Sequence, residues 1–215
     1  MFDEPPMEPP PTEPPPMEPP YWFEQALKNT PTSQHLQVMD CDIHYLRWGP
    51  EVSSRPGILF IHGASAHAHW WDFIAPFFCT DRPIAAIDLS GMGDSGWREG
   101  YGSKVHVPEI AAALADAKLG EKPIIVGHSF GGFMTMCYAH AHGAELSGAM
   151  IVDSPLRPEN RQPAERSRFS EPPKRPPNRV FTDPDEMIYR FRPIPPKYCD
   201  NEYIVEHIAR HSLKE

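Results

Sequence analysis

Cysteine is scarce in this chain, and long apolar runs are absent. The 215 residues include four cysteines, which stand far apart with no paired spacing. This pattern favours free thiols in a reducing compartment over a disulfide scaffold or a zinc knuckle. No apolar run approaches the roughly 18 residues that a membrane helix needs. The first residues, Met-Phe-Asp-Glu-Pro-Pro, lack both the basic and the apolar region of a secretion signal. We therefore expect a cytoplasmic protein without a membrane span.

Basic charge is also in short supply. Lys and Arg number 20 against 29 Asp and Glu, which gives a net charge of -9. This balance argues against nucleic acid as a partner, because a phosphate backbone needs a basic surface. Hydrophobic residues make up 40% and aromatic residues 11% of the chain, enough for a packed core. The length favours one domain with appendages.

Proline, by contrast, is abundant. Ten of the 28 prolines lie in residues 1–20 and eleven in residues 155–196. Glu-Pro-Pro occurs four times in the first segment, which predicts an extended, solvated tail; a Pro-rich ligand for an aromatic groove is the alternative. The composition therefore predicts a disordered tail over 1–20, a core over 21–154, and an insertion over 155–215 that lies above the core.

The core alternates between apolar strands and amphipathic helices. Apolar runs predict strands at 36–39, 43–48, 57–61, 83–87, 123–126 and 147–152, the first two forming a hairpin. Helical spacing predicts helices at 70–78, 107–119 and 130–142, and again at 202–213. Such alternation predicts an α/β fold, with a mostly parallel sheet and helices on both faces.

The strongest chemical signal is Gly127-His128-Ser129-Phe130-Gly131. It follows an apolar strand and opens an apolar helix, the context in which G-x-S-x-G forms a nucleophile elbow. A sharp strand-to-helix turn holds the serine in a strained conformation and points its hydroxyl away from the sheet. Glycines are needed at both ends because a Cβ there meets the neighbouring backbone. We expect Ser129 to be a nucleophile.

A second signal lies at the end of an earlier strand, in His62-Gly63-Ala64-Ser65. Attack of a serine on a carbonyl creates an oxyanion, which two backbone N–H groups must stabilise. The N–H groups of Phe130 and Ala64 are the two candidates, and His62 and Gly63 shape the loop.

The segment Asp88-Leu-Ser-Gly-Met-Gly-Asp-Ser-Gly96 contains the pattern G-x-G-x-x-G. It is typical of dinucleotide sites, but no apolar helix begins where the pyrophosphate would need its N-terminus. We interpret it as a structural crossover loop in which Asp88 orients backbone amides, and we expect no cofactor.

Taken together, these segments resemble the α/β-hydrolase family, of the kind with a helical cap. The matching pieces are the His62-Gly63 loop, the Asp88 loop, the Gly127–Gly131 elbow and the strand end Ile151-Val-Asp-Ser-Pro155. The resemblance implies a serine hydrolase that acts on a small-molecule carboxylic ester or related acyl compound through an acyl-enzyme on Ser129. Relatives that open halides or epoxides carry Asp at the elbow, so Ser129 favours acyl substrates.

The sequence departs from the family pattern after the sixth strand. The family places an acid after strand seven and a histidine after strand eight, and the chain reaches Glu215 without segments that match them. We therefore expect a sheet that lacks its last two strands and a partial cap. Asp153, at the tip of the sixth strand, is an alternative acid. The competing interpretation is an inactive fragment or a binding scaffold, because a serine without a base is a weak nucleophile.

Two histidine pairs remain. His207 and His211, four residues apart on one helix, could bind a metal or replace the base, but no third ligand accompanies them in the sequence. The favoured interpretation is a solvent-facing helix without a metal. His67 and His69 follow the oxyanion loop and could line a pocket; surface positions are the favoured alternative.

Overall fold

The computed structural model describes residues 18–154, 180–191 and 199–213. Residues 1–17 of the expected Pro-rich tail, and residues 155–179 and 192–198 of the expected insertion, lie outside the described residues. The strands are β1 (Thr32–Val38), β2 (Cys41–Trp48), β3 (Ile58–Ile61), β4 (Ile84–Ile87), β5 (Ile124–His128) and β6 (Gly148–Val152). The α-helices are α1 (Tyr21–Lys28), α2 (Ser103–Asp116), α3 (Phe130–His142), α5 (Pro184–Arg190) and α6 (Glu202–His211). Short 3-10 turns are η1 (Ala68–Trp71), η2 (Ala75–Phe77) and η3 (Gly143–Glu145).

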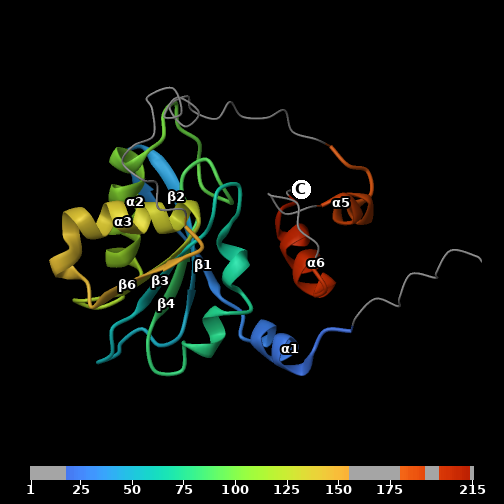
Figure 1. Cartoon of the computed structure of the whole chain (residues 1–215), viewed down its shortest axis with the longest axis horizontal. Coiled ribbons are helices and arrows are strands. Elements are labelled where there is room, and N and C mark those ends of the chain that lie inside the picture. The colour runs from blue at the N-terminus through green and yellow to red at the C-terminus, as the bar shows by residue number, and fades with distance from the viewer. Residues whose placement is uncertain (1–17, 155–179, 192–198, 214–215) are drawn as a thin grey trace, which may run out of the picture.

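The six strands form one sheet in the order β1-β2-β4-β3-β5-β6. The β1–β2 hairpin joins the sheet through an antiparallel pairing of β2 with β4. From β4 to β6 every pairing is parallel. The expected α/β fold is therefore confirmed, as is the hairpin, with β1 beginning four residues earlier than expected (Figure 1).

Side chains of the central strands alternate between two hydrophobic cores. In β3, Leu59 and Ile61 pack with residues of α2 and α3, whereas Ile58 and Phe60 pack with residues of the η1–η2 segment. This alternation with period two is what a strand buried on both faces requires. Figure 1 shows α2 and α3 on one side of the sheet and α1 and α6 towards the other.

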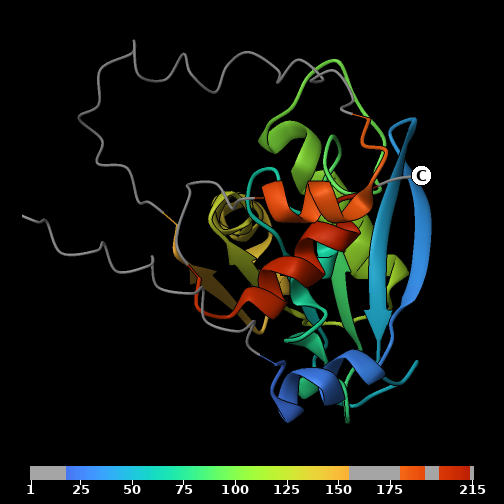
Figure 2. The same ribbon diagram turned by 90° about the vertical axis from the view of Figure 1, so that its right-hand side faces the viewer.

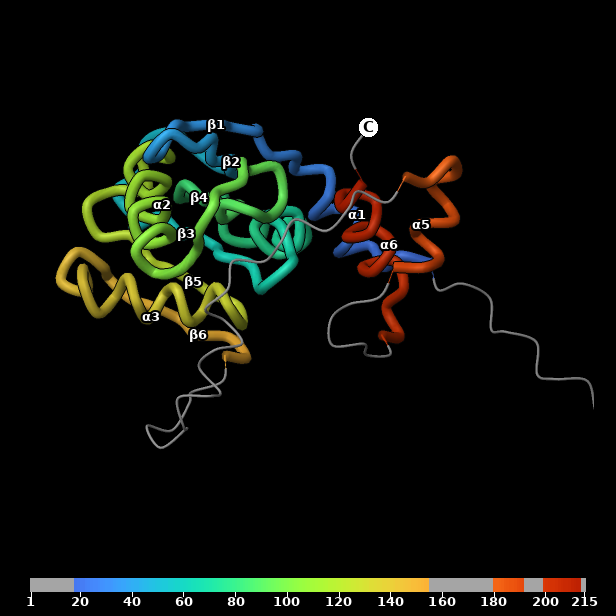
Figure 3. The backbone as a smooth tube through the Cα atoms, turned by 90° about the horizontal axis from the view of Figure 1, so that it is seen from above, coloured from blue at the N-terminus to red at the C-terminus, as the bar shows by residue number. Residues whose placement is uncertain are grey.

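A third apolar cluster holds α6 in place. Phe23 of α1, Phe73 between the two 3-10 turns, and Tyr203 and Ile208 of α6 are buried together. Figures 2 and 3 show α1, α5 and α6 grouped on the same side of the molecule, away from α3. Part of the expected insertion thus packs against the core. None of the described helices has both the length and the hydropathy needed to cross a membrane.

Two helical predictions need correction, and the described helices α1 and α5 fall outside the predictions. The expected helix over 70–78 is instead the pair η1 and η2, because Pro76 at the start of η2 has no N–H to donate to a continuous helix. Helix α2 begins at Ser103 and ends at Asp116, so the prediction of 107–119 was displaced towards the C-terminus. Helix α1 was not predicted; the carbonyl of Pro20 accepts hydrogen bonds from the N–H groups of Phe23 and Glu24 at its start.

Candidate active site

Ser129 occupies the sharp turn between β5 and α3. Its backbone has φ 50° and ψ -112°, a left-handed conformation that costs a residue with a Cβ about 1–3 kcal/mol. The N–H of Ser129 donates to the carbonyl of Val152 in β6 at 2.9 Å, and its carbonyl accepts from the N–H of Phe133 at 3.1 Å. The surrounding sheet and helix thus hold the strained turn. The Ser129 side chain is half-buried.

Glycine is required at two positions of the turn because neither position has room for a side chain. A Cβ on Gly131 would lie 2.5 Å from the carbonyl oxygens of Ile61 and His62 in the neighbouring strand end. A Cβ on Gly127 would collide with the carbonyl of Gly131 and the hydroxyl of Thr135. The two glycines therefore let α3 start directly against β3 and β5.

The tip of β6 lies beside the same turn. The Ser154 hydroxyl donates to the carbonyl of Ser129 at 2.8 Å, which ties the residues after β6 to the elbow. Asp153, the alternative acid, lies between this contact and the strand, is exposed, and has φ 47°. Its carboxylate makes no hydrogen bond to a histidine within the described ranges.

The His62–Ala64 loop lies next to Ser129. A Cβ on Gly63 would be 3.0 Å from the His128 ring and 3.4 Å from the Ser129 Cβ. The Gly63 carbonyl accepts from His62 Nδ1 at 2.7 Å and from the Ala66 N–H at 3.3 Å. In a trans peptide the next N–H points the opposite way. The N–H of Ala64 is therefore directed away from the His62 ring.

His62 is wholly buried and structural in its contacts. Its Nε2 accepts from the Leu89 N–H at 3.2 Å, so the ring proton lies on Nδ1, towards Gly63. Burial lowers the pKa of His62, because its charged form would lose solvation. A neutral His62 thus links the loop after β3 to the loop after β4.

Asp88 lies at the end of β4 and is fully buried. Its Oδ1 accepts from the Ala68 N–H at 2.6 Å, and its Oδ2 accepts from the Asp94 N–H at 2.9 Å. Its Oδ2 is also 2.7 Å from His44 Nδ1. Burial opposes ionisation, but the hydrogen bonds from His44 and Asp94 outweigh it and lower the pKa of Asp88. The carboxylate connects β2, η1 and the loop after β4.

A second buried carboxylate, Glu109, lies in the middle of α2. It accepts from the Ser90 N–H at 3.1 Å and contacts His106 at 2.9 Å and Arg98 at 3.0 Å. Burial raises its pKa, yet the hydrogen bonds from His106 and Ser90 leave that pKa below its ordinary value. Glu109 therefore holds the glycine-rich loop against α2.

One histidine of each pair departs from the favoured interpretation, whereas His211 is exposed as expected. His207 is only partly exposed, and its Nε2 is 3.0 Å from Oδ2 of Asp72. His67 is buried, and its Nε2 is 3.0 Å from the Ser212 hydroxyl. Neither residue is therefore a free surface histidine. The sequence offered no signal for Asp72, which lies 135 residues from His207 along the chain.

Comparison with known proteins agrees with this architecture. A model of the alpha/beta hydrolase family matches residues 58–210. The lipase LipV of Mycobacterium tuberculosis is 35% identical over 116 residues, covering 54% of this chain and 42% of that protein. The esterase Rv0045c of the same organism is 33% identical over 131 residues, covering 60% of this chain and 42% of that protein. The chain therefore matches less than half the length of each of these relatives.

Among solved structures, the thioesterase domain from the curacin biosynthetic pathway has the same fold. The TM-score is 0.68 at 22% identity, over 85% of this chain and 68% of that one. Because the family model covers well over half of the chain and includes both the His62 loop and the Ser129 turn, the chain belongs to the alpha/beta hydrolase family.

Proposed function

We propose that the chain contributes the nucleophile and the oxyanion-binding groups of a serine hydrolase acting on carboxylic esters or related acyl compounds. The observation that carries this is the left-handed Ser129 between β5 and α3, with φ 50°. Strain of this kind persists only where the surrounding structure enforces it, and it is found at functional turns. The similarity to proteins named as a lipase and an esterase supports an acyl substrate.

In the proposed reaction, a general base removes the Ser129 proton as its oxygen attacks the substrate carbonyl. The tetrahedral oxyanion then accepts hydrogen bonds from the N–H groups of Phe130 and Ala64. The first turn of a helix leaves its N–H groups without intrahelical partners, which makes Phe130 N–H available at the start of α3. The fixed Gly63 carbonyl supports the orientation of Ala64 N–H. Water later releases the acyl group.

A second candidate function is a non-catalytic binding scaffold. Within residues 18–154, 180–191 and 199–213, no histidine ring hydrogen-bonds the hydroxyl of Ser129, which favours this candidate. Asp153 precedes Ser154, whose hydroxyl donates to the Ser129 carbonyl, and under the first candidate Asp153 would orient a base. The two candidates make opposite predictions for ester turnover.

Hydrolysis of p-nitrophenyl acetate and p-nitrophenyl butyrate separates them. Under the hydrolase proposal, Ser129→Ala lowers kcat/KM at least about a thousand-fold, because the nucleophile is lost. The matched control is Ser54→Ala, an exposed serine in the loop between β2 and β3, which is expected to leave kcat/KM within about twofold. Turnover by the unchanged chain that is no faster than the Ser129→Ala background supports the scaffold instead.

A further inference from the structure

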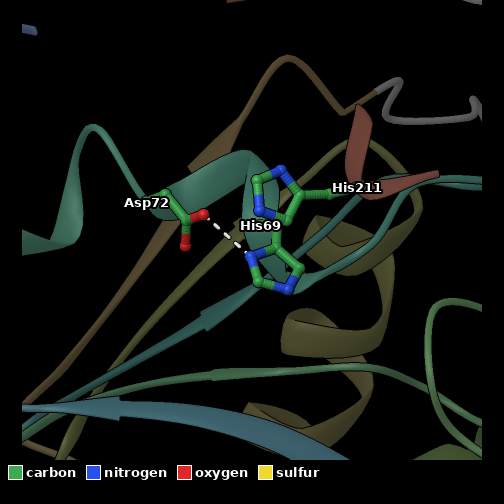
Figure 4. A group of neighbouring side chains, drawn as sticks. All are labelled: His69, Asp72 and His211. Atoms are coloured by element: carbon green, nitrogen blue, oxygen red, sulfur yellow. Dashed lines mark hydrogen bonds and ion pairs between the residues drawn. The ribbon is translucent and has the colours of Figure 1, made fainter. Parts of the chain in front are cut away.

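A cluster of polar side chains joins α6 to the η1 turn, separate from the Ser129 turn. His69 lies in η1 and Asp72 immediately follows it, while His207 and His211 lie one turn apart on α6. Asp72 Oδ2 is 2.8 Å from His69 Nδ1 and 3.0 Å from His207 Nε2. Figure 4 shows His69, Asp72 and His211 converging from these two elements.

The hydrogen bonding of this cluster is incomplete. Asp72 is 6% exposed, and its Oδ1 has no hydrogen-bond partner among the described residues. Nδ1 of His67, on a ring 5.9 Å from that of His69, is likewise buried without a partner there. Buried polar atoms in folded proteins are nearly always paired, and an orphan calls for a water or an ion. The unpaired Asp72 oxygen therefore points to a bound species.

The imidazoles present the lone pairs that a metal ion needs. His211 Nδ1 is 2.8 Å from the carbonyl of His207, so the Nδ1 proton donates to that carbonyl and the lone pair lies on Nε2. Such a bond to the outer nitrogen is the usual way in which a metal-binding histidine is oriented. The rings of His69 and His211 stack with centroids 4.0 Å apart, so η1 and α6 are in contact at this point.

The spacing of the ligand atoms suits a small transition ion. One ligand atom from each of His69, Asp72 and His211 lies within 4.8 Å of the other two. Metal–nitrogen distances of about 2.0–2.1 Å place tetrahedral ligand atoms about 3.4 Å apart. Side-chain rotations that move the ligand atoms by roughly 1–1.5 Å would therefore complete the site. The donor set, imidazole with one carboxylate, favours Zn²⁺ or Co²⁺ over Mg²⁺ or Ca²⁺, which prefer oxygen ligands.

A second group of three potential ligands, His44, Asp88 and Asp94, provides a contrast. Both oxygens of Asp88 already accept hydrogen bonds, from Ala68 and from Asp94 and His44. Neither oxygen of Asp88 is therefore a buried acceptor without a partner. The orphan oxygen of Asp72 is what distinguishes the cluster at α6.

We propose that His69, Asp72 and His211 form a binding site for Zn²⁺ or a similar divalent transition ion. This proposal differs from the expectation of a solvent-facing helix without a metal. His69 lies in η1, Asp72 directly follows η1, and His211 lies in α6. A bound ion would therefore fasten α6 to the core. The proposal does not depend on the function proposed for Ser129.

Titration with Co²⁺ tests it, because tetrahedral Co²⁺ absorbs visible light strongly. The experiment uses the untagged chain at neutral pH, with competition by Zn²⁺. The proposal predicts one saturable site per chain with the visible bands of nitrogen-and-oxygen coordination, displaced by one equivalent of Zn²⁺. Asp72→Asn, which keeps the side chain's size, and the double variant His69→Gln with His211→Gln should each weaken binding at least about tenfold.

The matched control is the pair His140→Gln with His142→Gln, two histidines on α3 away from the cluster, which should leave Co²⁺ binding unchanged. Far-ultraviolet circular dichroism establishes that each variant is folded. Absence of saturable binding by the unchanged folded chain overturns the proposal. Equal affinity of the folded His69→Gln, His211→Gln variant and the unchanged chain also overturns it.

Discussion

Asp88 and Asp72 are both buried carboxylates surrounded by histidines, and they differ in one respect. Asp88 has hydrogen bonds to both oxygens, from two backbone N–H groups and His44. Asp72 has two histidines on one oxygen and none of the described groups on the other. A buried carboxylate with hydrogen bonds to both oxygens stabilises the fold, whereas one with a free oxygen is available to a ligand.

The largest expected effect is the cost of removing the satisfied carboxylate. Asp88→Ala should lower the free energy of unfolding by about 3–5 kcal/mol, because two N–H groups and a buried histidine lose their partner. Asp72→Ala should cost distinctly less in metal-free buffer, about 1–2 kcal/mol, because it also removes an unsatisfied oxygen. Urea unfolding followed by circular dichroism measures both.

The control for that pair is Asp81→Ala, which removes an exposed ion pair with Arg55 and should cost less than about 1 kcal/mol. Equal losses of unfolding free energy for Asp88→Ala and Asp72→Ala would contradict the proposed difference between the two carboxylates.

A smaller effect should follow from acid. Burial lowers the pKa values of His62 and His67, that of His67 to about 4. The unfolded chain therefore binds more protons, so stability should fall as pH drops below the ordinary histidine pKa of about 6.5. His69 has the opposite sign, because its bond to Asp72 outweighs burial and raises its pKa.

Asp88 and Glu109 act at lower pH. Because hydrogen bonds lower their folded-state pKa values, their stabilisation is present above the ordinary carboxyl pKa of about 4 and is lost as pH falls towards the folded values. Urea midpoints at a series of pH values measure both ranges. A urea midpoint that stays constant between pH 7.5 and pH 5 would contradict the lowered pKa values of the buried histidines.

How much of this could be read from the sequence depends on whether the interaction is local. Strands at 57–61 and 83–87 follow from unbroken apolar runs, and the helix over 130–142 from its flanking turn and Gly143. Helix α1 and the two 3-10 turns were missed because Pro76 and the packing of Phe23 against Phe73 decide them. Those are a local break and a tertiary contact that periodicity does not reveal.

The candidate site divides in the same way. The Ser129 turn depends on neighbouring glycines, so five consecutive residues predict it. The burial of His207 depends on Asp72, which belongs to a distant segment. A helix face with His207 and His211 therefore read as solvated until the partner segment was placed against it. Long-range polar contacts are the part of the structure that a sequence pattern does not specify.

If the strained turn makes Ser129 a nucleophile, a reagent that reacts covalently with activated serines should modify it. A fluorophosphonate probe is incubated with the unchanged chain, and the modified residue is located by peptide mass spectrometry. We expect one probe per chain, on Ser129, with no labelling of Ser129→Ala. An unlabelled chain, or a probe found on Ser65 or Ser154 instead, would contradict it.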